Sequence, residues 1–451
     1  MIKENDQPEI KEPIGVLGYG VEGVSTSKYL LARGYSDITV FDRKRPMDLD
    51  TRIKYGKGDG RNYLAGIPSM RTLFRSAGVR PDLPEIAEFL KWGGTLTSQT
   101  GLAISLAGRE RIIGVTGTLG KGTCCSLLHA ILIEAGIPAA LGGNIGIPAL
   151  DLAASLAPGM KLILELSSFQ LSTLPTSPAM AAVLKTTSEH LDWHLSQDEY
   201  WLHKANLVAS QSKDDFLTYH ADAPGSAWIA SQSCARKLAF GTNADVCING
   251  DEVRWTKRGF SIPLSATRLH GAFNLENLAA AGTLALELGA EPQHVLAAAA
   301  AFPGLEHRLE FVRQVRGISF YNDSYATRPE ASMGAVQALN DAPLGLILGG
   351  SDKLANFSEL AKTIASAPWI RAIALIGQTA DRLESELRTA GLPNTGKPEI
   401  VKVNTLEMAV EYLLSKVEKG VIVLSPACAS FGMFENYKER GKAFKRLVAG
   451  L

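Results

Sequence analysis

The stretch Arg111–Gly136, RIIGVTGTLGKGTCCSLLHAILIEAG, decides the fold because an apolar run passes through a glycine-rich turn into a helical pattern. Glycines let backbone N–H groups converge on phosphate oxygens, and the positive end of the following helix adds to that attraction. Lys121 supplies a point charge for terminal phosphates, and a hydroxyl after it can reach a magnesium ion. The order of strand, loop, lysine and helix therefore predicts a phosphate-binding loop made of Gly117, Thr118, Gly120, Lys121, Gly122 and Thr123.

This loop departs from the standard pattern, in which Ser or Thr directly follows the lysine. Gly122 takes that place here, and the hydroxyl comes one residue later, at Thr123. A glycine-rich helix cap without a ligand is the alternative interpretation.

The bulk composition narrows the classes of function. A chain of 451 residues is too long for one ordinary core, and its 46 basic and 46 acidic residues cancel. That balance argues against a nucleic-acid or membrane-surface binder. No apolar run reaches the roughly 18–20 residues that span a bilayer, and the polar start MIKENDQPEIKEP does not resemble a signal peptide. Five cysteines without a CxxC motif favour free thiols, so we expect a cytoplasmic protein without membrane insertion.

Short apolar runs alternate with helical patterns along the chain, which predicts parallel sheets covered by helices on both faces. The alternation begins with IGVLGYG at 14–20, restarts at 112–117 and returns with ISFYNDS at 318–324. We therefore expect an α/β protein of three domains. These are a Rossmann-like domain at residues 1–100, a central P-loop ATPase-type domain with a parallel or mixed sheet at 101–304, and a second Rossmann-like domain at 305–451.

The first block carries glycines in GxGxxG spacing, followed about 20 positions later by an acidic residue: Gly18, Gly20, Gly23 and Asp42. Alone, this pattern is typical of a dinucleotide-binding domain. Physically it predicts a place for a pyrophosphate near a helix start.

Polar residues also follow later strands. Glu165 ends the run LILELSS, where a carboxylate beside a phosphate loop suits a magnesium ligand; a buried capping glutamate is the alternative. The segment SEHLDWH at 188–194 is dense in possible ligands, although helix capping explains it equally well. Lys204 alone would be read as a solvated lysine. NDSYAT, LILGGSDK and VLSPACASF, at 322–327, 346–353 and 423–431, are expected to meet at one crevice or to be simple turns.

These motifs, in this order and across essentially the whole chain, resemble those of the Mur ligase family. The resemblance also rests on GGNIGIPAL, ELSSFQL, GAFNLENLAAA and FPGLEHRLE, at 142–150, 165–171, 271–281 and 302–310. It implies ATP-dependent ligation of glutamate, with D-glutamate favoured, to UDP-N-acetylmuramoyl-L-alanine through an acyl phosphate in peptidoglycan precursor synthesis. It also implies two magnesium ions and a monomer.

The resemblance assigns roles position by position. Lys121 and Thr123 would hold ATP phosphates and magnesium, Glu165 and His190 would be metal ligands, and Lys204 would be carbamylated by CO2 to orient a second magnesium. Lys121, His190 and Lys204 are thus the implied catalytic residues. The UDP group would lie against Gly18, Gly20, Gly23, Asp42 and Arg43, and Asn144 would touch the substrate. Asn274, Arg308 and Asp323 would bind the nucleotide, and the incoming amino acid would meet Thr327, Lys353, Ser430 and Tyr437.

Two positions leave alternatives open. Tyr325 stands where the glutamate-adding members usually have lysine, and Tyr437 stands where phenylalanine is common. A lost positive charge near a dicarboxylate should weaken binding or shift recognition to Lys353. The pattern ATRPEA at 326–331 resembles variants of the family that add L-glutamate, so L-glutamate is an alternative substrate. Gly122 followed by Thr123 is typical of folylpolyglutamate synthases, although those lack an N-terminal UDP-binding domain. A nicotinamide dehydrogenase and an inactive nucleotide-binding protein are the remaining alternatives.

Overall fold

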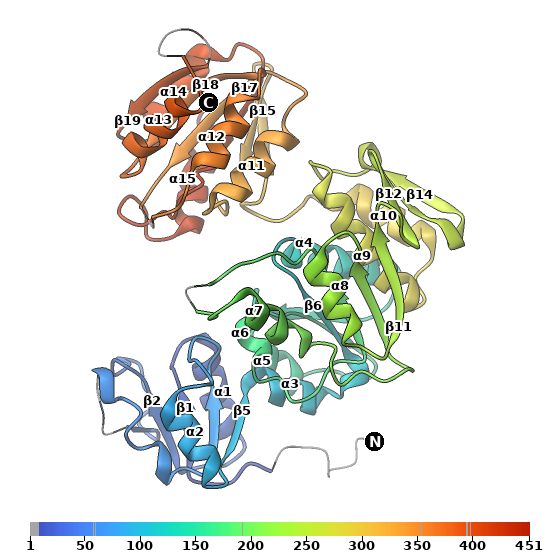
Figure 1. Cartoon of the computed structure of the whole chain (residues 1–451), viewed down its shortest axis with the longest axis vertical. Coiled ribbons are helices and arrows are strands. Elements are labelled where there is room, and N and C mark those ends of the chain that lie inside the picture. Colours follow the sequence, from blue (N-terminus) through green and yellow to red (C-terminus); the bar gives the residue numbers. More distant parts are fainter. Residues whose placement is uncertain are drawn as a thin grey trace. The chain divides into compact units, whose positions relative to one another are not determined.

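The computed structural model describes residues 9–56, 58, 60–191, 193–352, 354–393, 396 and 398–451. Three sheets form in this part of the chain, which confirms the predicted α/β class (Figure 1). The chain folds into two compact units. One contains the residues up to Pro263 with Leu275–Ala300, and the other contains Leu264–Asn274 with Ala301–Leu451.

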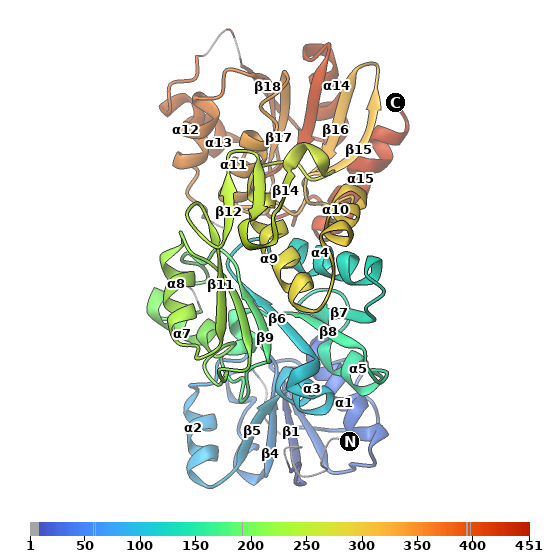
Figure 2. The same ribbon diagram turned by 90° about the vertical axis from the view of Figure 1, so that its right-hand side faces the viewer.

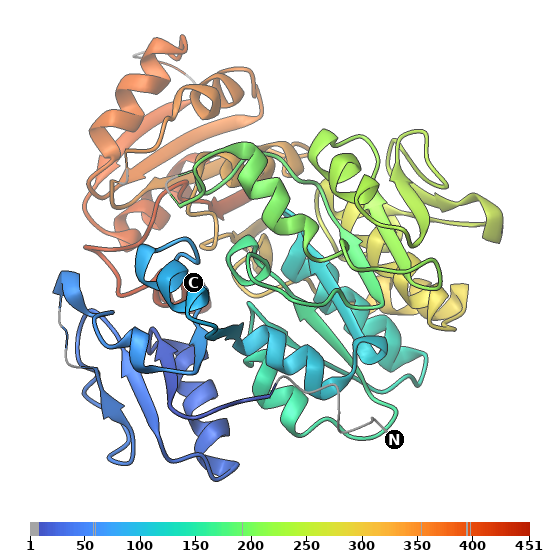
Figure 3. The same ribbon diagram turned by 60° about the horizontal axis from the view of Figure 1, so that its bottom comes forward.

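The N-terminal sheet has the strand order β3-β2-β1-β4-β5, with all neighbours parallel (Figure 3, blue). Its strands are β1 (Ile14–Leu17), β2 (Ile38–Phe41), β3 (Lys54–Tyr55), β4 (Thr72–Arg75) and β5 (Thr95–Ser98). The helices are α1 (Val21–Ala32), α2 (Pro84–Lys91) and α3 (Gln99–Ala107). All four residues of β1 are buried, as expected for a strand covered on both faces.

The central sheet has nine strands in the order β14-β13-β12-β11-β10-β9-β6-β8-β7, and β6 and β9 lie side by side in it (Figure 2). The strands are β6 (Ile112–Thr116), β7 (Ala139–Gly143), β8 (Lys161–Glu165), β9 (Met180–Val183), β10 (Phe216–His220), β11 (Arg236–Gly241), β12 (Val246–Asn249), β13 (Glu252–Trp255) and β14 (Phe260–Pro263). The sheet is parallel from β7 to β12, while β12, β13 and β14 pair antiparallel. Of the two expected forms, parallel or mixed, the sheet is therefore mixed.

Helices separate most of these strands. They are α4 (Lys121–Glu134), α5 (Ala149–Ala154), α6 (Ser168–Leu171), α7 (Gln197–Ala205) and α8 (Pro224–Ser231). Two more helices, α9 (Phe273–Glu287) and α10 (Pro292–Ala301), follow β14. No helix among the residues described above is long and apolar enough to cross a membrane.

The C-terminal sheet has the order β15-β16-β20-β17-β18-β19. Its strands are β15 (Glu310–Val315), β16 (Ile318–Asn322), β17 (Leu344–Gly349), β18 (Ile370–Ile376), β19 (Glu399–Val403) and β20 (Gly420–Leu424). Only β15 pairs antiparallel, with β16.

Two buried apolar clusters show that helices cover both faces of this sheet. One cluster includes residues of α11 (Pro329–Ala338), α12 (Ser358–Ala365) and α13 (Ala380–Thr389), namely Val336, Leu360 and Leu383 respectively. The other cluster includes Leu413 of α14 (Leu406–Lys416) and Phe444 of α15 (Tyr437–Ala449). The predicted doubly wound arrangement is therefore present, and the domain boundaries at 100 and 304 remain predictions.

Candidate active site

The predicted phosphate loop connects β6 to α4, which begins at Lys121. Gly120 has a φ of 84°, and a Cβ there would overlap the Asn277 side chain. Gly117 has a φ of 153°, and a Cβ there would lie 2.8 Å from the Leu184 side chain. Only glycine fits either position, so this backbone requires the glycines that the sequence pattern supplies.

Lys121 folds back over this loop. Its Nζ donates hydrogen bonds to the carbonyls of Gly117 and Thr118, each at 3.0 Å. Gly122 and Thr123 follow in the first turn of α4, where both are buried. One short segment thus contains Lys121, the start of α4 and the hydroxyl of Thr123.

Glu165 ends β8, the strand next to β6, and is 2% exposed. Its Oε1 accepts a hydrogen bond from Nδ2 of Asn144 at 2.8 Å. Its Oε2 has no hydrogen-bond partner within the part of the chain that the structure describes. Leaving a buried carboxylate oxygen unpaired is costly, and a hard cation is the partner that carboxylates take most readily. The chemistry of Glu165 therefore fits a magnesium ligand better than a simple cap.

Lys204 lies on α7 and is 1% exposed, so the solvated lysine considered from the sequence is wrong. Its Nζ donates to Oγ1 of Thr116 at 3.1 Å and to the carbonyl of Gly117 at 2.9 Å. Burial, followed by the nearby charge of Lys121, holds the pKa of Lys204 well below its ordinary value. A lowered pKa raises the fraction of neutral amine, the form that attacks CO2.

The segment after β9 carries His190, whose φ is 58° and whose ring packs 4.8 Å from that of Phe169. His190 Nε2 lies 3.6 Å from a carboxylate oxygen of Glu189. Asp192, two residues after His190, lies outside the described residues. His194, at the end of the segment, is fully buried, and burial followed by the charge of His203 lowers its pKa to about 4.

The N-terminal glycines form a tight turn between β1 and α1. Gly18 has a φ of 83°, and a Cβ on Gly23 would overlap the Gly18 carbonyl. Gly20 has no such constraint, since a Cβ there would meet nothing within 4 Å. Asp42 ties the turn to β2, because its Oδ2 accepts a hydrogen bond from the backbone N–H of Tyr19 at 2.8 Å. Arg43, the next residue, lies over the ring of Tyr63 at 5.9 Å.

In the other compact unit, Asp323 follows β16 and is 7% exposed. Its carboxylate accepts hydrogen bonds from the hydroxyl of Ser425 at 2.7 Å and from the N–H of Leu309 at 3.1 Å. Burial raises the pKa of Asp323 to about 7.

Tyr325 lies beside two other candidate residues of this unit. The guanidinium of Arg308 lies 3.9 Å from the centre of the Tyr325 ring, and the ring of Tyr437 meets it edge-on at 5.0 Å. Tyr325 therefore has a cation beside it.

The remaining candidates in this unit are placed as follows. Asn274 donates from Nδ2 to the His270 carbonyl at 2.7 Å, Thr327 is exposed, and Ser430 is 3% exposed. Lys353 lies outside the described residues.

Comparison with known proteins decides the family. The family model described as "Mur ligase middle domain" matches residues 115–285, and "Mur ligase, glutamate ligase domain" matches residues 307–428. A UDP-N-acetylmuramoylalanine–D-glutamate ligase from Symbiobacterium thermophilum is 33% identical over 98% of this chain and 99% of its own length. Its namesake from Acetivibrio thermocellus is 34% identical over 96% of each chain. The chain belongs to the Mur ligase family.

Solved structures of the family share the fold. The ligase MurC of Thermotoga maritima superposes with a TM-score of 0.60 at 16% identity, covering 97% of this chain and 99% of its own. MurF of Acinetobacter baumannii gives a TM-score of 0.63 at 16% identity over 97% of this chain and 90% of its own. A MurF from Thermotoga maritima, solved with ADP, gives 0.62 at 17% identity over 100% of this chain and 97% of its own. The three-sheet arrangement is thus that of Mur ligases.

Arg75, the last residue of β4, was not among the predicted site residues, yet it is 1% exposed. Its guanidinium donates to the carbonyls of Val79 at 2.6 Å and Phe169 at 2.8 Å, and to Oγ of Ser172 at 2.8 Å. It therefore ties the loop after β4 to α6, the helix that follows Glu165. The available signal was its position, a cation at a strand end directly before the loop that begins with SAGVRPD at 76–82.

Proposed function

We propose that this Mur ligase uses ATP to join glutamate, with D-glutamate favoured, to UDP-N-acetylmuramoyl-L-alanine in peptidoglycan precursor synthesis. One observation carries the proposal: Lys121, the unpaired oxygen of Glu165 and the buried amine of Lys204 gather where β6 and β8 end. Relatives 33–34% identical across nearly the whole chain bear the name of this D-glutamate ligase.

The reaction proceeds in two steps. A carboxylate oxygen of the UDP-linked L-alanine attacks the γ-phosphorus of ATP, the bond to the β–γ bridging oxygen breaks, and ADP leaves. The glutamate amine then attacks the acyl carbon, the bond from that carbon to the phosphate oxygen breaks, and the amine gives up its proton to solvent. This chemistry needs alignment and charge neutralisation more than a protein nucleophile.

The residues of the first compact unit divide this work. Lys121 and the N–H groups of residues 117–123 neutralise ATP phosphate charge. Thr123, Glu165 and His190 would hold magnesium, two ions in all, which stabilise the negative charge that develops during transfer. A carbamate on Lys204 would turn a buried amine into an anion able to orient the second ion, and Asn144 would meet the substrate beside Glu165.

The other assignments belong to the same proposal. The turn formed by Gly18, Gly20 and Gly23, with Asp42 and Arg43, holds the UDP group. In the second unit, Asn274, Arg308 and Asp323 bind the nucleotide, while the incoming amino acid meets Thr327, Lys353, Ser430 and Tyr437. The domains comprise residues 1–100, 101–304 and 305–451, and the enzyme works as a cytoplasmic monomer.

Phosphate release from ATP tests this proposal. The purified chain is given UDP-N-acetylmuramoyl-L-alanine with D-glutamate, with L-glutamate or with neither, and dihydropteroate replaces the UDP substrate in a further arm. We expect turnover only when the UDP substrate and D-glutamate are both present. Turnover with L-glutamate alone would correct the enantiomer, and turnover only with dihydropteroate would replace the function by folate chemistry.

A further inference from the structure

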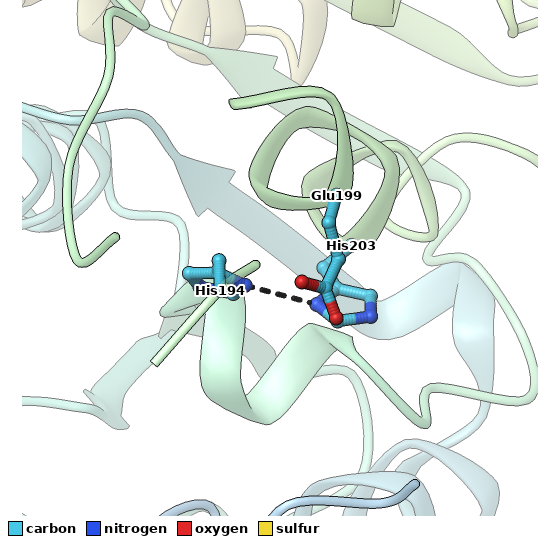
Figure 4. Close-up of side chains that lie close together, drawn as sticks. All are labelled: His194, Glu199 and His203. Atoms are coloured by element: carbon cyan, nitrogen blue, oxygen red, sulfur yellow. Dashed lines mark hydrogen bonds between the residues drawn. The ribbon is translucent and has the colours of Figure 1, made fainter. Parts of the chain in front are cut away.

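A cluster of possible metal ligands lies beside the start of α7, formed by His194, Glu199 and His203 (Figure 4). Nδ1 of His194 lies 3.2 Å from Nδ1 of His203. One ring nitrogen of each histidine and a carboxylate oxygen of Glu199 all lie within 4.8 Å of one another. His194 is fully buried, whereas the other two side chains are half-buried.

The local structure explains why the three side chains meet. Ser196 caps α7, its hydroxyl accepting a hydrogen bond from the N–H of Glu199 at 3.1 Å, which fixes where the helix begins. Glu199 and His203 are four residues apart on this helix and therefore share one face. His194 approaches that face from the loop that precedes the helix. Lys204, the next residue, points elsewhere, because its Nζ bonds to Thr116 and Gly117.

The separation of the two histidine nitrogens matches that of two ligands in a tetrahedral transition-metal site. Metal–nitrogen bonds of about 2.0–2.1 Å at tetrahedral angles place two ligand nitrogens about 3.3 Å apart. Nδ1 of His194 and Nδ1 of His203 lie at nearly that separation before any ion is added. The carboxylate of Glu199 would complete the set, although one of its oxygens accepts from the N–H of Leu195 and the other pairs with Arg80. Water would fill the fourth position.

The second nitrogen of His194 also has the partner that a metal-binding histidine needs. Its Nε2 lies 2.9 Å from Oγ of Ser168, so an Nε2–H that donates to this hydroxyl leaves the Nδ1 lone pair facing the cluster. Such outer hydrogen bonds orient ligand rings and fix their tautomer.

We propose that His194, Glu199 and His203 bind one divalent transition-metal ion of the zinc type, at a site separate from the magnesium ligands. The ion would join the loop that contains His194 to α7, the helix that presents Lys204. Arg80 is the competitor, since its guanidinium lies 3.4 Å from Glu199 and also donates to the carbonyl of Trp193. The metal ion must therefore compete with Arg80 for the carboxylate of Glu199. We expect this competition to lower the affinity for the ion without preventing binding.

A second cluster, Glu306, His307 and Glu310, does not support the same inference. Lys445 already occupies it, with its Nζ 2.7 Å from Glu306 and 2.8 Å from Glu310.

The test uses the full chain, freed of metal by chelator and kept in excess Mg²⁺ without nucleotide. Titration with Co²⁺ should give the strong visible absorption of tetrahedral cobalt at one ion per chain. His203→Ala should weaken binding about 100-fold or more, and Glu199→Gln should weaken it in the same direction. His294→Ala is the matched control, because His294 lies on α10 away from the cluster and should bind as the wild type does.

Zn²⁺ gives an independent readout. It should displace Co²⁺ and raise the thermal midpoint of the wild type and of His294→Ala but not of His203→Ala, since an ion bound only by the folded state stabilises it. Absence of stoichiometric Co²⁺ binding in the wild type would overturn the proposal. So would equal binding by wild type and His203→Ala, which would place the ion elsewhere.

Discussion

Replacing Lys204 by arginine should abolish both a carbamate and ligation, because arginine keeps the positive charge but cannot add CO2. Carbamylation joins the neutral amine nitrogen to the carbon of CO2 and releases one proton. At an ordinary lysine pKa of about 10.4, roughly one amine in 250 is neutral at about pH 8. Each unit by which the pKa falls raises that fraction about tenfold, and burial beside Lys121 moves the pKa of Lys204 in this direction.

The assay is ¹³C NMR of the full chain in ¹³C-labelled bicarbonate, with phosphate release measured on the same samples. The wild type should show one carbamate resonance, and Lys204→Arg should lose the resonance together with about 100-fold or more of kcat. Lys213→Arg, at an exposed lysine, is the control and should keep both. The reasoning is refuted if Lys204→Arg keeps the resonance, or if the wild type turns over fully without a carbamate in CO2-free buffer.

Three further changes test other parts of the structure. Glu165→Gln removes the charge at the unpaired Oε2, so half-maximal phosphate release should need about 100-fold more Mg²⁺, whereas an unchanged Mg²⁺ titration would contradict the assignment. Arg75→Met removes the hydrogen bonds that the buried guanidinium donates and should lower the free energy of unfolding in urea by about 3–5 kcal/mol. Arg71→Met, exposed just before the same strand, should cost less than about 0.5 kcal/mol, and equal losses would argue against the role of the Arg75 hydrogen bonds. Because the folded pKa of Asp323 is raised to about 7, its stabilising contribution is present below about pH 4 and is lost as pH rises through about 7. Between about pH 5 and pH 8 the urea midpoint of the wild type should therefore fall more than that of Asp323→Asn, and parallel midpoints would mean that Asp323 does not titrate there.

Local patterns in the sequence predicted the turn from β6 into α4, because the glycine conformations, the strand end and the helix start all lie within residues 112–123. Its binding of phosphate stays a prediction. The same reasoning placed Glu165 correctly at a strand end beside that loop. Membership of the Mur ligase family and the α/β class were also predicted and are confirmed.

Features that depend on distant parts of the chain could not be predicted in this way. Its local sequence alone predicted that Lys204 is solvated. The side chain is instead buried, and its Nζ donates to Thr116 and Gly117, which lie almost ninety residues earlier in the chain. The importance of Arg75 rests on acceptors at Phe169 and Ser172, more than ninety residues later. The sequence analysis allowed a mixed central sheet but did not locate its antiparallel strands β13 and β14, because the alternation of strands and helices marks only the parallel ones.

The central claim is that the substrate carboxylate becomes an acyl phosphate before the amide forms. It is tested most directly with UDP-N-acetylmuramoyl-L-alanine whose carboxylate carries oxygen-18, together with ATP and D-glutamate. When the amine displaces phosphate, one carboxylate oxygen must leave with it. Mass spectrometry should therefore find one labelled oxygen in each phosphate released, in step with the formation of the amide product. Unlabelled phosphate, or phosphate release without the amide product, would contradict the account.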